Sequence, residues 1–479
     1  MKNKTLFALI FCILFGLTTN PAYAQDTVEY PVYLVKTGDT LNSIAILFDV
    51  TTDEITQLNN ISDPDSIYPG MSLMIPGLPG ISGILTPSVI GLGESWNQVL
   101  IKYQLNEESA IRLNKLLNPS GIYTGTKLLL PLSNNDLDFG PKAQMEVGST
   151  FLEKAVILES NPDILLIKNR KESIFQVFPT ELIFDNSENL QNINPFSSRI
   201  DSLSISPLPL TQGDTVVVQI RSPQPITLSG QLAGYPLRFF SDNGADYFAL
   251  QGIHAMAETG LTDFSISGSN GSQQIFSIQN DIYLSPGSFD EDPPLKVNPQ
   301  TIDPRVTQPE QEQIETIVAS FTPQKYWQGE FISPDRDYGL GMDSDYYQDI
   351  ISSFGSRRTY NDDPTVTFHT GVDFGGGESL PIVAPAAGRV VFADSRPIRG
   401  NATIIDHGLG VYSAYYHQSK ILVNVGDLVT AGQKIGEVGN TGRVDRADEY
   451  EGAGAHLHWE MWVNGVQVNP MDWVFTQYP

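Results

Sequence analysis

Two stretches near the start of the chain, residues 33–76 and 88–131, repeat one pattern of apolar positions. In the first, a short apolar segment leads to Asp39-Thr40, a pair typical of a helix N-cap. Apolar residues then recur at helical spacing, a second short helical pattern follows, and an apolar triplet stops at Pro76. The second stretch keeps this order at an offset of about 55 residues. Each stretch is therefore predicted to form strand, helix, helix and strand.

Strand-like patterns dominate the middle of the chain. Residues 134–203 hold apolar runs at 155–158 and 164–167, which we interpret as strands of a β-rich region without an assigned role. Residues 204–287 contain short strand patterns separated by turns about every 8–12 residues, which predicts a β-sandwich. Residues 288–306 have the proline-rich, acidic composition of a linker. Thr307 and Glu310 then resemble a capping box, so a helix and its connection are expected in 307–347.

The first 24 residues have the three parts of a secretory signal peptide. Lys2 and Lys4 precede an apolar run over 6–17, and a small-residue cleavage signal ends at Ala24. The run is too short to span a membrane, and no later segment is long and apolar enough. Cleavage would remove the only cysteine, Cys12, and would change the formal net charge from −27 to −29 by removing two lysines. We therefore expect an exported protein of the cell envelope or exterior, without disulfides.

Composition narrows the class of partner and of fold. With 55 acidic and 28 basic residues, the chain would repel the phosphates of nucleic acid, so nucleic acid is not an expected partner. The content of apolar residues, 41%, allows several packed cores. Abundant glycine, proline and aromatic residues favour short strands and turns. The predicted fold class is multidomain and mainly β.

Candidate chemistry gathers at the C-terminus, where five of the six histidines lie after residue 368. In the strand pattern over 455–463, His456, His458 and Glu460 share one face, because alternate residues of a strand point to the same side. His369 and Asp373 also share a face if their segment is extended, and Gly371 between them leaves room for an ion. Nitrogen and oxygen ligands without thiolate suit zinc, although an iron site can use the same types. Metal-assisted hydrolysis is the expected reaction class.

The repeated stretches resemble the LysM domain, through the pattern Gly38-Asp39-Thr40 and the later Leu-Asn and Tyr-Pro-Gly groups. The resemblance implies a βααβ fold over 25–80 and binding to N-acetylglucosamine polymers such as peptidoglycan. The second module, 81–133, is degenerate because Glu94-Ser95-Trp96 replaces the usual residues. Sugar binding and a spacer role remain alternatives for it.

Residues 348–479 resemble the lysostaphin/LytM-type zinc metallopeptidases. The matching segments are 354–358, 369–374, 383–391, 405–408, 425–433, 439–442, 456–460 and 469–470. The resemblance implies a compact antiparallel β-fold with a groove and one zinc ion. Carried over by position, His369, Asp373 and His458 are the zinc ligands, and His417 and His456 are catalytic, one as general base and the other stabilising the oxyanion. Glu460 is either a residue that orients His456 or an ordinary exposed acid.

Two other histidines have no place in this pattern. His407 lies in a segment that we interpret as a turn, and His254 lies alone in the predicted sandwich, so both are expected to be structural. That sandwich resembles the immunoglobulin-like spacers found before cell-wall peptidases. The connection over 443–455 is longer and more acidic than the family pattern, with Ala455 where proline is usual, and it would rim the groove. Tyr360 and Asn361 are candidate groove residues.

These observations predict a zinc endopeptidase that cuts peptide stems or cross-bridges of bacterial peptidoglycan. LysM modules would hold the glycan while the C-terminal domain cleaves the peptide. We expect one zinc ion per chain and a monomer. The alternatives are a non-enzymatic peptidoglycan-binding regulator of other hydrolases and a zinc peptidase of secreted glycine-rich proteins.

Overall fold

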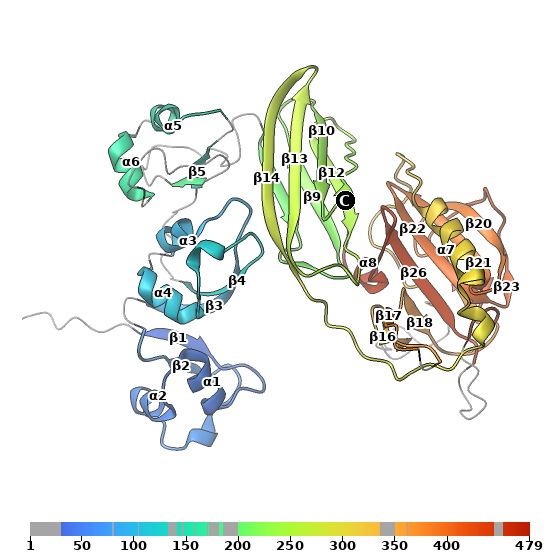
Figure 1. The fold of residues 1–479 in the computed structure, drawn as a ribbon, viewed down its shortest axis with the longest axis horizontal. Coiled ribbons are helices and arrows are strands. Elements are labelled where there is room, and N and C mark those ends of the chain that lie inside the picture. The colour runs from blue at the N-terminus through green and yellow to red at the C-terminus, as the bar shows by residue number, and fades with distance from the viewer. Residues whose placement is uncertain are drawn as a thin grey trace, which may run out of the picture. The chain divides into compact units, whose positions relative to one another are not determined.

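The structure, a computed structural model, divides into two compact units, residues 1–82 and 83–479 (Figure 1). It describes residues 30–78, 81–103, 105–132, 141–145, 148–158, 160–169, 171, 182–184, 200–335, 350–361, 363–444 and 454–479. The predicted signal peptide lies outside these residues. Strands predominate among the described elements, so the mainly β, multidomain prediction is confirmed. Among the described residues, no helix combines the length and apolar character needed to cross a membrane.

The first module has the predicted order β1 (Pro31–Leu34), α1 (Leu41–Phe48), α2 (Thr52–Asn59) and β2 (Ser72–Met74), with a 3-10 turn, η1 (Pro64–Ser66), before β2. Thr40 caps α1 by accepting a hydrogen bond from the Ser43 backbone N–H. Asn59 at the end of α2 exchanges two hydrogen bonds with the backbone of Met74 in β2. The helices are thereby fixed onto the antiparallel β1–β2 pair.

The second module repeats this order with β3 (Gly83–Val89), α3 (Trp96–Lys102), α4 (Glu107–Asn114), η2 (Pro119–Gly121) and β4 (Lys127–Leu132). Asn114, which corresponds to Asn59 in the repeat, makes the same pair of hydrogen bonds, here with the backbone of Leu129. β3 and β4 pair in antiparallel register. The internal repeat seen in the sequence is thus a repeat of structure, down to one side chain that holds helix and strand together.

The strand prediction for 155–158 and 164–167 is wrong. The described part of this region forms β5 (Pro141–Gln144), α5 (Phe151–Ile157), α6 (Pro162–Lys168) and β6 (Leu182–Phe184), a third strand-helix-helix-strand order. Thr150 and Glu153 form a capping box that starts α5. The buried apolar residues follow helical spacing, with Phe151, Ala155 and Leu158 on one face. The Thr150 capping box was the signal in the sequence that distinguishes helix from strand here.

The middle domain contains two β-sheets that enclose an apolar core. One sheet has the order β11-β10-β13-β14-β8 and the other β12-β9-β7, which confirms a sandwich-like arrangement. Its resemblance to an immunoglobulin domain stays a prediction. The strands are β7 (Ser202–Ser206), β8 (Leu210–Thr211), β9 (Thr215–Arg221), β10 (Thr227–Leu232), β11 (Tyr235–Pro236), β12 (Asp246–Gly252), β13 (Gly260–Asn270) and β14 (Gln273–Ser285).

The C-terminal domain is built on one antiparallel sheet of order β15-β18-β26-β22-β21-β20-β24, with β27 paired to β26. One face packs into a large apolar core that includes Trp459 of β26 and Trp473 of α8 (Pro470–Phe475). The strands are β15 (Ile350–Ser352), β18 (Val372–Phe374), β20 (Gly388–Arg396), β21 (Gly400–Gly408), β22 (Val411–Gln418), β24 (Leu428–Val429), β26 (Leu457–Val463) and β27 (Val466–Val468). Two smaller sheets consist of β16 (Arg357–Arg358) with β17 (Thr367–Phe368), and of β19 (Pro381–Val383), β25 (Lys434–Glu437) and β23 (Lys420–Ile421).

Helix α7 (Pro304–Val318) covers part of the other face of this sheet and lies across β20, β21 and β22 (Figure 1). It begins earlier than predicted, because Asp303 is its N-cap, and Thr307 lies inside it. Glu310 is not part of a capping box. Its carboxylate is buried and accepts hydrogen bonds from the backbone of Ile398 and Arg399. The helix therefore starts within the predicted linker and packs against the C-terminal sheet.

Candidate metal centre

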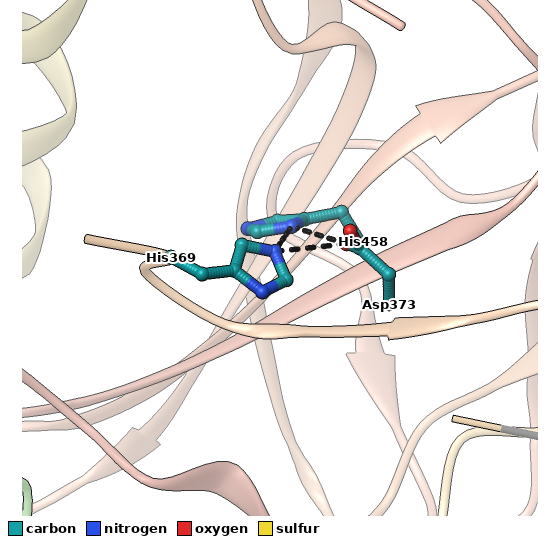
Figure 2. A group of neighbouring side chains, drawn as sticks. All are labelled: His369, Asp373 and His458. Carbon is teal, nitrogen blue, oxygen red and sulfur yellow. Dashed lines mark hydrogen bonds and ion pairs between the residues drawn. The ribbon is translucent and has the colours of Figure 1, made fainter. Parts of the chain in front are cut away.

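Three predicted ligands meet in the C-terminal domain. His369 follows β17, Asp373 lies in β18, and His458 lies in β26, which pairs with β18. The Asp373 carboxylate oxygen Oδ1 lies 2.7 Å from His458 Nδ1 and 3.1 Å from His369 Nε2. The two imidazole nitrogens are 3.0 Å apart. Figure 2 shows these three side chains pointing toward one another from separate segments.

Hydrogen bonds on the far side of each imidazole direct an unprotonated nitrogen into this cluster. His369 Nδ1 lies 2.9 Å from the carbonyl oxygen of Ser353, which can only accept, so Nδ1 carries the proton. His458 Nε2 lies 3.3 Å from the Glu460 carboxylate, so it donates there. Nε2 of His369 and Nδ1 of His458 are then left with lone pairs directed at a shared point. This arrangement is the one that ligating histidines adopt.

The carboxylates of Asp373 and Glu460, on either side of His458, also favour a cation in the cluster. Burial alone would raise the pKa of Asp373, but the two imidazoles hold it well below its usual range. Burial alone would lower the pKa of His458, but Asp373 and Glu460 raise it to about 9. One positive charge therefore belongs between these carboxylates, and a divalent cation can supply it in place of the proton. The residues present fit a metal ion with nitrogen and oxygen ligands.

Gly371 is required by the closeness of the strands around the centre. A Cβ atom on this residue would lie 2.3 Å from the carbonyl oxygen of Trp459 and 2.9 Å from His458 Nε2. Both contacts are far shorter than real Cβ contacts. A larger side chain would push His458 away from Asp373, so glycine here keeps room for the ligands.

Glu460 orients His458, and the prediction that it orients His456 is wrong. Its carboxylate accepts hydrogen bonds from Tyr416 Oη at 3.1 Å, Trp462 Nε1 at 2.8 Å and Gln467 Nε2 at 3.1 Å, besides facing His458. Burial would raise the pKa of Glu460, but His458 and the nearby Arg399 hold it at about 2. The side chain is 1% exposed, so it is not an ordinary surface acid either.

His417 and His456 lie beside the ligand cluster, with ring centroids 4.9 Å apart. His417 Nδ1 donates to the Thr441 carbonyl oxygen at 2.8 Å, and His456 Nδ1 donates to the Gly454 carbonyl oxygen at 3.2 Å. Nε2 of each ring therefore points away from these carbonyl oxygens, and that of His456 is 3.9 Å from Asp373 Oδ1. Burial and the imidazoles of His456 and His458 hold the pKa of His417 well below its ordinary value, which keeps it neutral.

The cluster opens into a groove of about 1090 Å³. The ligands and both further histidines line it, as does predicted groove residue Tyr360. Asn361 instead exchanges hydrogen bonds with the backbone of Val297. His254 also lines the groove, through a loop of the middle domain, and packs edge-on against Phe368. The groove is thus bounded by residues from two domains, which the separate sequence patterns did not indicate.

His407 lies outside the group of candidate metal ligands. It lies in β21 rather than in a turn, is fully buried, and bonds the Ala387 carbonyl oxygen and the Ser413 hydroxyl. Burial lowers its pKa to about 4. These contacts agree with a structural role.

Comparison with known proteins identifies two domains in the chain. Residues 367–470 match the model of Peptidase family M23, and residues 33–76 match that of the LysM domain. Peptidoglycan DD-endopeptidase ShyA of Vibrio cholerae is 40% identical over 122 residues, which are 26% of this chain and 26% of the relative. DD-carboxypeptidase/endopeptidase Mpg of Neisseria meningitidis serogroup B is 35% identical over 133 residues, 28% of this chain and 29% of the relative.

Both relatives are matched over only about a quarter of their length. Among solved structures, a putative peptidase M23 from Pseudomonas aeruginosa is similar with 21% identity and a TM-score of 0.38, covering 56% of this chain and 95% of that one. The chain therefore contains a LysM domain and a Peptidase M23 domain, and the latter includes all five histidine and aspartate positions of the candidate centre.

Proposed function

We propose that the protein is a zinc-dependent endopeptidase that hydrolyses the peptide part of bacterial peptidoglycan. The observation that carries this proposal is the convergence of His369 Nε2, Asp373 Oδ1 and His458 Nδ1, with both imidazoles set by outer hydrogen bonds to present lone pairs. The similarity of the Peptidase M23 domain to peptidoglycan DD-endopeptidases supports the choice of substrate.

His369, Asp373 and His458 would hold the zinc ion. When bound, zinc supplies Lewis acidity beside the peptide carbonyl group. His417 and His456 both present Nε2 toward the same region. One of these imidazoles would accept the proton of an attacking water, and the other would stabilise the developing oxyanion. Both rings donate from Nδ1 to a backbone carbonyl oxygen, so either histidine can take either task.

The proposed role of the first module is to hold the glycan near the groove. The LysM match supports a contribution to peptidoglycan binding, and tethering raises the local concentration of a polymeric substrate. The proposed setting is accordingly extracytoplasmic, and the proposed assembly is a monomer. The second and third modules share the order of elements of the first.

Product analysis tests the proposal. The full-length chain, its His458→Ala variant and a chelator-treated sample are incubated with purified peptidoglycan, and released fragments are identified by mass spectrometry. We expect new amino and carboxyl ends at one kind of peptide bond, absent from the variant and restored to the treated sample by zinc. Circular dichroism of the variant serves as the control for folding.

Intact peptides in the presence of bound zinc would contradict the proposal. Such a result together with glycan binding would favour a regulator of other hydrolases. Cleavage of glycine-rich protein but not of peptidoglycan would favour a zinc peptidase of secreted glycine-rich proteins. Zinc stoichiometry is measured on the same samples, and one ion per chain is expected.

A further inference from the structure

Three arginines line the groove beside the metal centre, in a chain with a net charge of −27. Two of them are neutralised by the protein itself. Arg358 pairs with Asp292 at 2.9 Å, and Arg399 pairs with Glu310 at 3.0 Å. Their side chains are only 10% and 12% exposed. These two arginines therefore hold the fold together, and their charge is not available to a ligand.

Arg443 is different. Within the described ranges of the chain, no carboxylate forms an ion pair with it. Its Nη1 donates to the Thr301 carbonyl oxygen at 3.3 Å, and its guanidinium lies 4.9 Å from the ring centre of Tyr360. These contacts support one edge and one face of the guanidinium, while Nε and Nη2 have no hydrogen-bond partner among the described residues. A positioned guanidinium with a free edge suits a carboxylate, which it can bind through two parallel hydrogen bonds.

The segment that carries Arg443 is fixed to the catalytic region. The Arg443 backbone N–H donates to the Ile398 carbonyl oxygen at 2.7 Å, and Thr441 accepts the hydrogen bond from His417 Nδ1. Gly442 has a φ of +83°, and a Cβ atom there would lie 2.3 Å from the Gly400 nitrogen. One tightly packed segment thus sets both His417 and Arg443. His417 and Arg443 both line the groove, so a peptide bound along it can contact both.

We infer that Arg443 binds a free carboxylate of the peptide substrate and makes the protein selective for the acid over the amide. The inference rests on the proposed function and specifies its substrate class. Carboxylates of a peptide occur at its C-terminus and on acidic side chains, and either can supply the ligand. Conversion to the amide removes the negative charge and one of the two acceptor oxygens, so the paired hydrogen bonds are lost.

The test compares kcat/KM for three soluble peptide-stem substrates. One has all carboxylates free, one is amidated at the C-terminus, and one is amidated on its acidic side chain. We expect the wild-type chain to prefer the free acid by about 10-fold or more, the effect of a hydrogen-bonded charge pair. In Arg443→Ala the preference disappears through a rise in KM, and in Arg443→Lys it is partly kept. The position at which amidation lowers kcat/KM of the wild-type chain identifies the carboxylate that Arg443 binds.

Arg389→Ala is the matched control, because Arg389 is exposed, is also an arginine of the C-terminal domain and does not line the groove. It should keep the wild-type preference. Equal rates on acid and amide by the wild type, or an unchanged preference in Arg443→Ala, would overturn the inference while leaving endopeptidase activity established. If no substrate is hydrolysed, the proposed function fails, and the calorimetric Kd of the same peptides still decides the acid preference and its dependence on Arg443.

Discussion

His458 illustrates how one side chain acquires its role from the contacts on both its edges. Nδ1 faces Asp373, while Nε2 faces Glu460, whose other contacts all come from hydrogen-bond donors. The Tyr416 ring stacks on the imidazole, with centroids 5.5 Å apart and planes 7° apart. These contacts fix the orientation and the tautomer of the imidazole before any ion binds. They thereby reduce the entropy that is lost when the ligands become ordered around an ion.

Replacing Glu460 by glutamine should weaken zinc binding by roughly 10- to 100-fold, the usual effect of losing a group that supports a metal-ligating histidine. The amide no longer offers a full negative charge to His458 Nε2–H. Competition with a chromogenic chelator measures the affinity. Glu437→Gln is the control, since this acid pairs with Lys434 away from the groove. An unchanged affinity in Glu460→Gln would show that the contact does not support the ligand.

His407 should make the unfolding free energy depend on pH. Burial lowers its folded pKa from 6.5 to about 4, so the unfolded chain binds more protons between these values and stability falls as pH falls. Between pH 7 and 5 the loss from this residue is roughly 2 kcal/mol. Urea titrations of the zinc-loaded protein and of His407→Gln measure it. The variant, although less stable throughout, should show a shallower pH dependence, and equal slopes would contradict the prediction.

Helix α7, which covers one face of the C-terminal sheet, is linked to the metal centre through a chain of side-chain contacts. Glu310 binds Arg399, the Arg399 guanidinium lies 5.2 Å from the centre of the Tyr416 ring, and Tyr416 donates to Glu460. The helix also buries Ile314 and Val318 against β21 and β22. It precedes the residues that match the Peptidase M23 model, yet it belongs to the same folded domain.

Glu310→Ala should lower the free energy of unfolding by about 3–5 kcal/mol, because it leaves the Arg399 charge buried without its partner. Glu312→Ala, an exposed acid on the same helix, should change it by less than about 0.5 kcal/mol. Urea-induced unfolding followed by tryptophan fluorescence compares the two. Similar midpoints for both variants would mean that the buried pair does not stabilise the domain.

At the scale of the whole molecule, the middle domain is joined to the C-terminal domain by specific contacts. Trp473 Nε1 donates to the Thr215 hydroxyl, and Arg357 Nη2 donates to the Ala255 carbonyl oxygen. Arg357 also lies over the ring of Phe289. Residues 290–297, inside the predicted linker, hydrogen-bond along 357–361. The two domains therefore share one compact unit, whereas residues 1–82 form another.

A chain that begins at Gly83 should lose activity on insoluble peptidoglycan by about 100-fold, because tethering by the first module is lost. Its kcat/KM on a soluble peptide stem should stay within about two-fold of the full chain, since the gain from tethering applies only to the polymer. Release of dye-labelled fragments measures the first activity and mass spectrometry the second. Equal activities of both chains on the polymer would contradict anchoring by residues 30–82.

The sequence pattern by itself indicated the order of elements in the first two modules, while the candidate ligands His369, Asp373 and His458 followed from the resemblance to lysostaphin/LytM-type peptidases. Local signals suffice for the pattern, because a capped helix, a strand of alternating residues and a repeat at fixed offset each involve only nearby positions. His456, His458 and Glu460 share a face for this reason, and their apolar neighbours Leu457 and Trp459 are fully buried.

Only the tertiary structure decided which groups meet. The spacing along β26 places Glu460 on the same face as His458, but the contacts of Glu460 with Tyr416 of β22 and of Tyr416 with Arg399 depend on long-range packing. The apolar runs of the third module are by themselves compatible with strand or helix, and their burial in one cluster shared by α5 and α6 shows which they form. Arg443 and Tyr360 are 83 positions apart, and their contact depends on long-range packing.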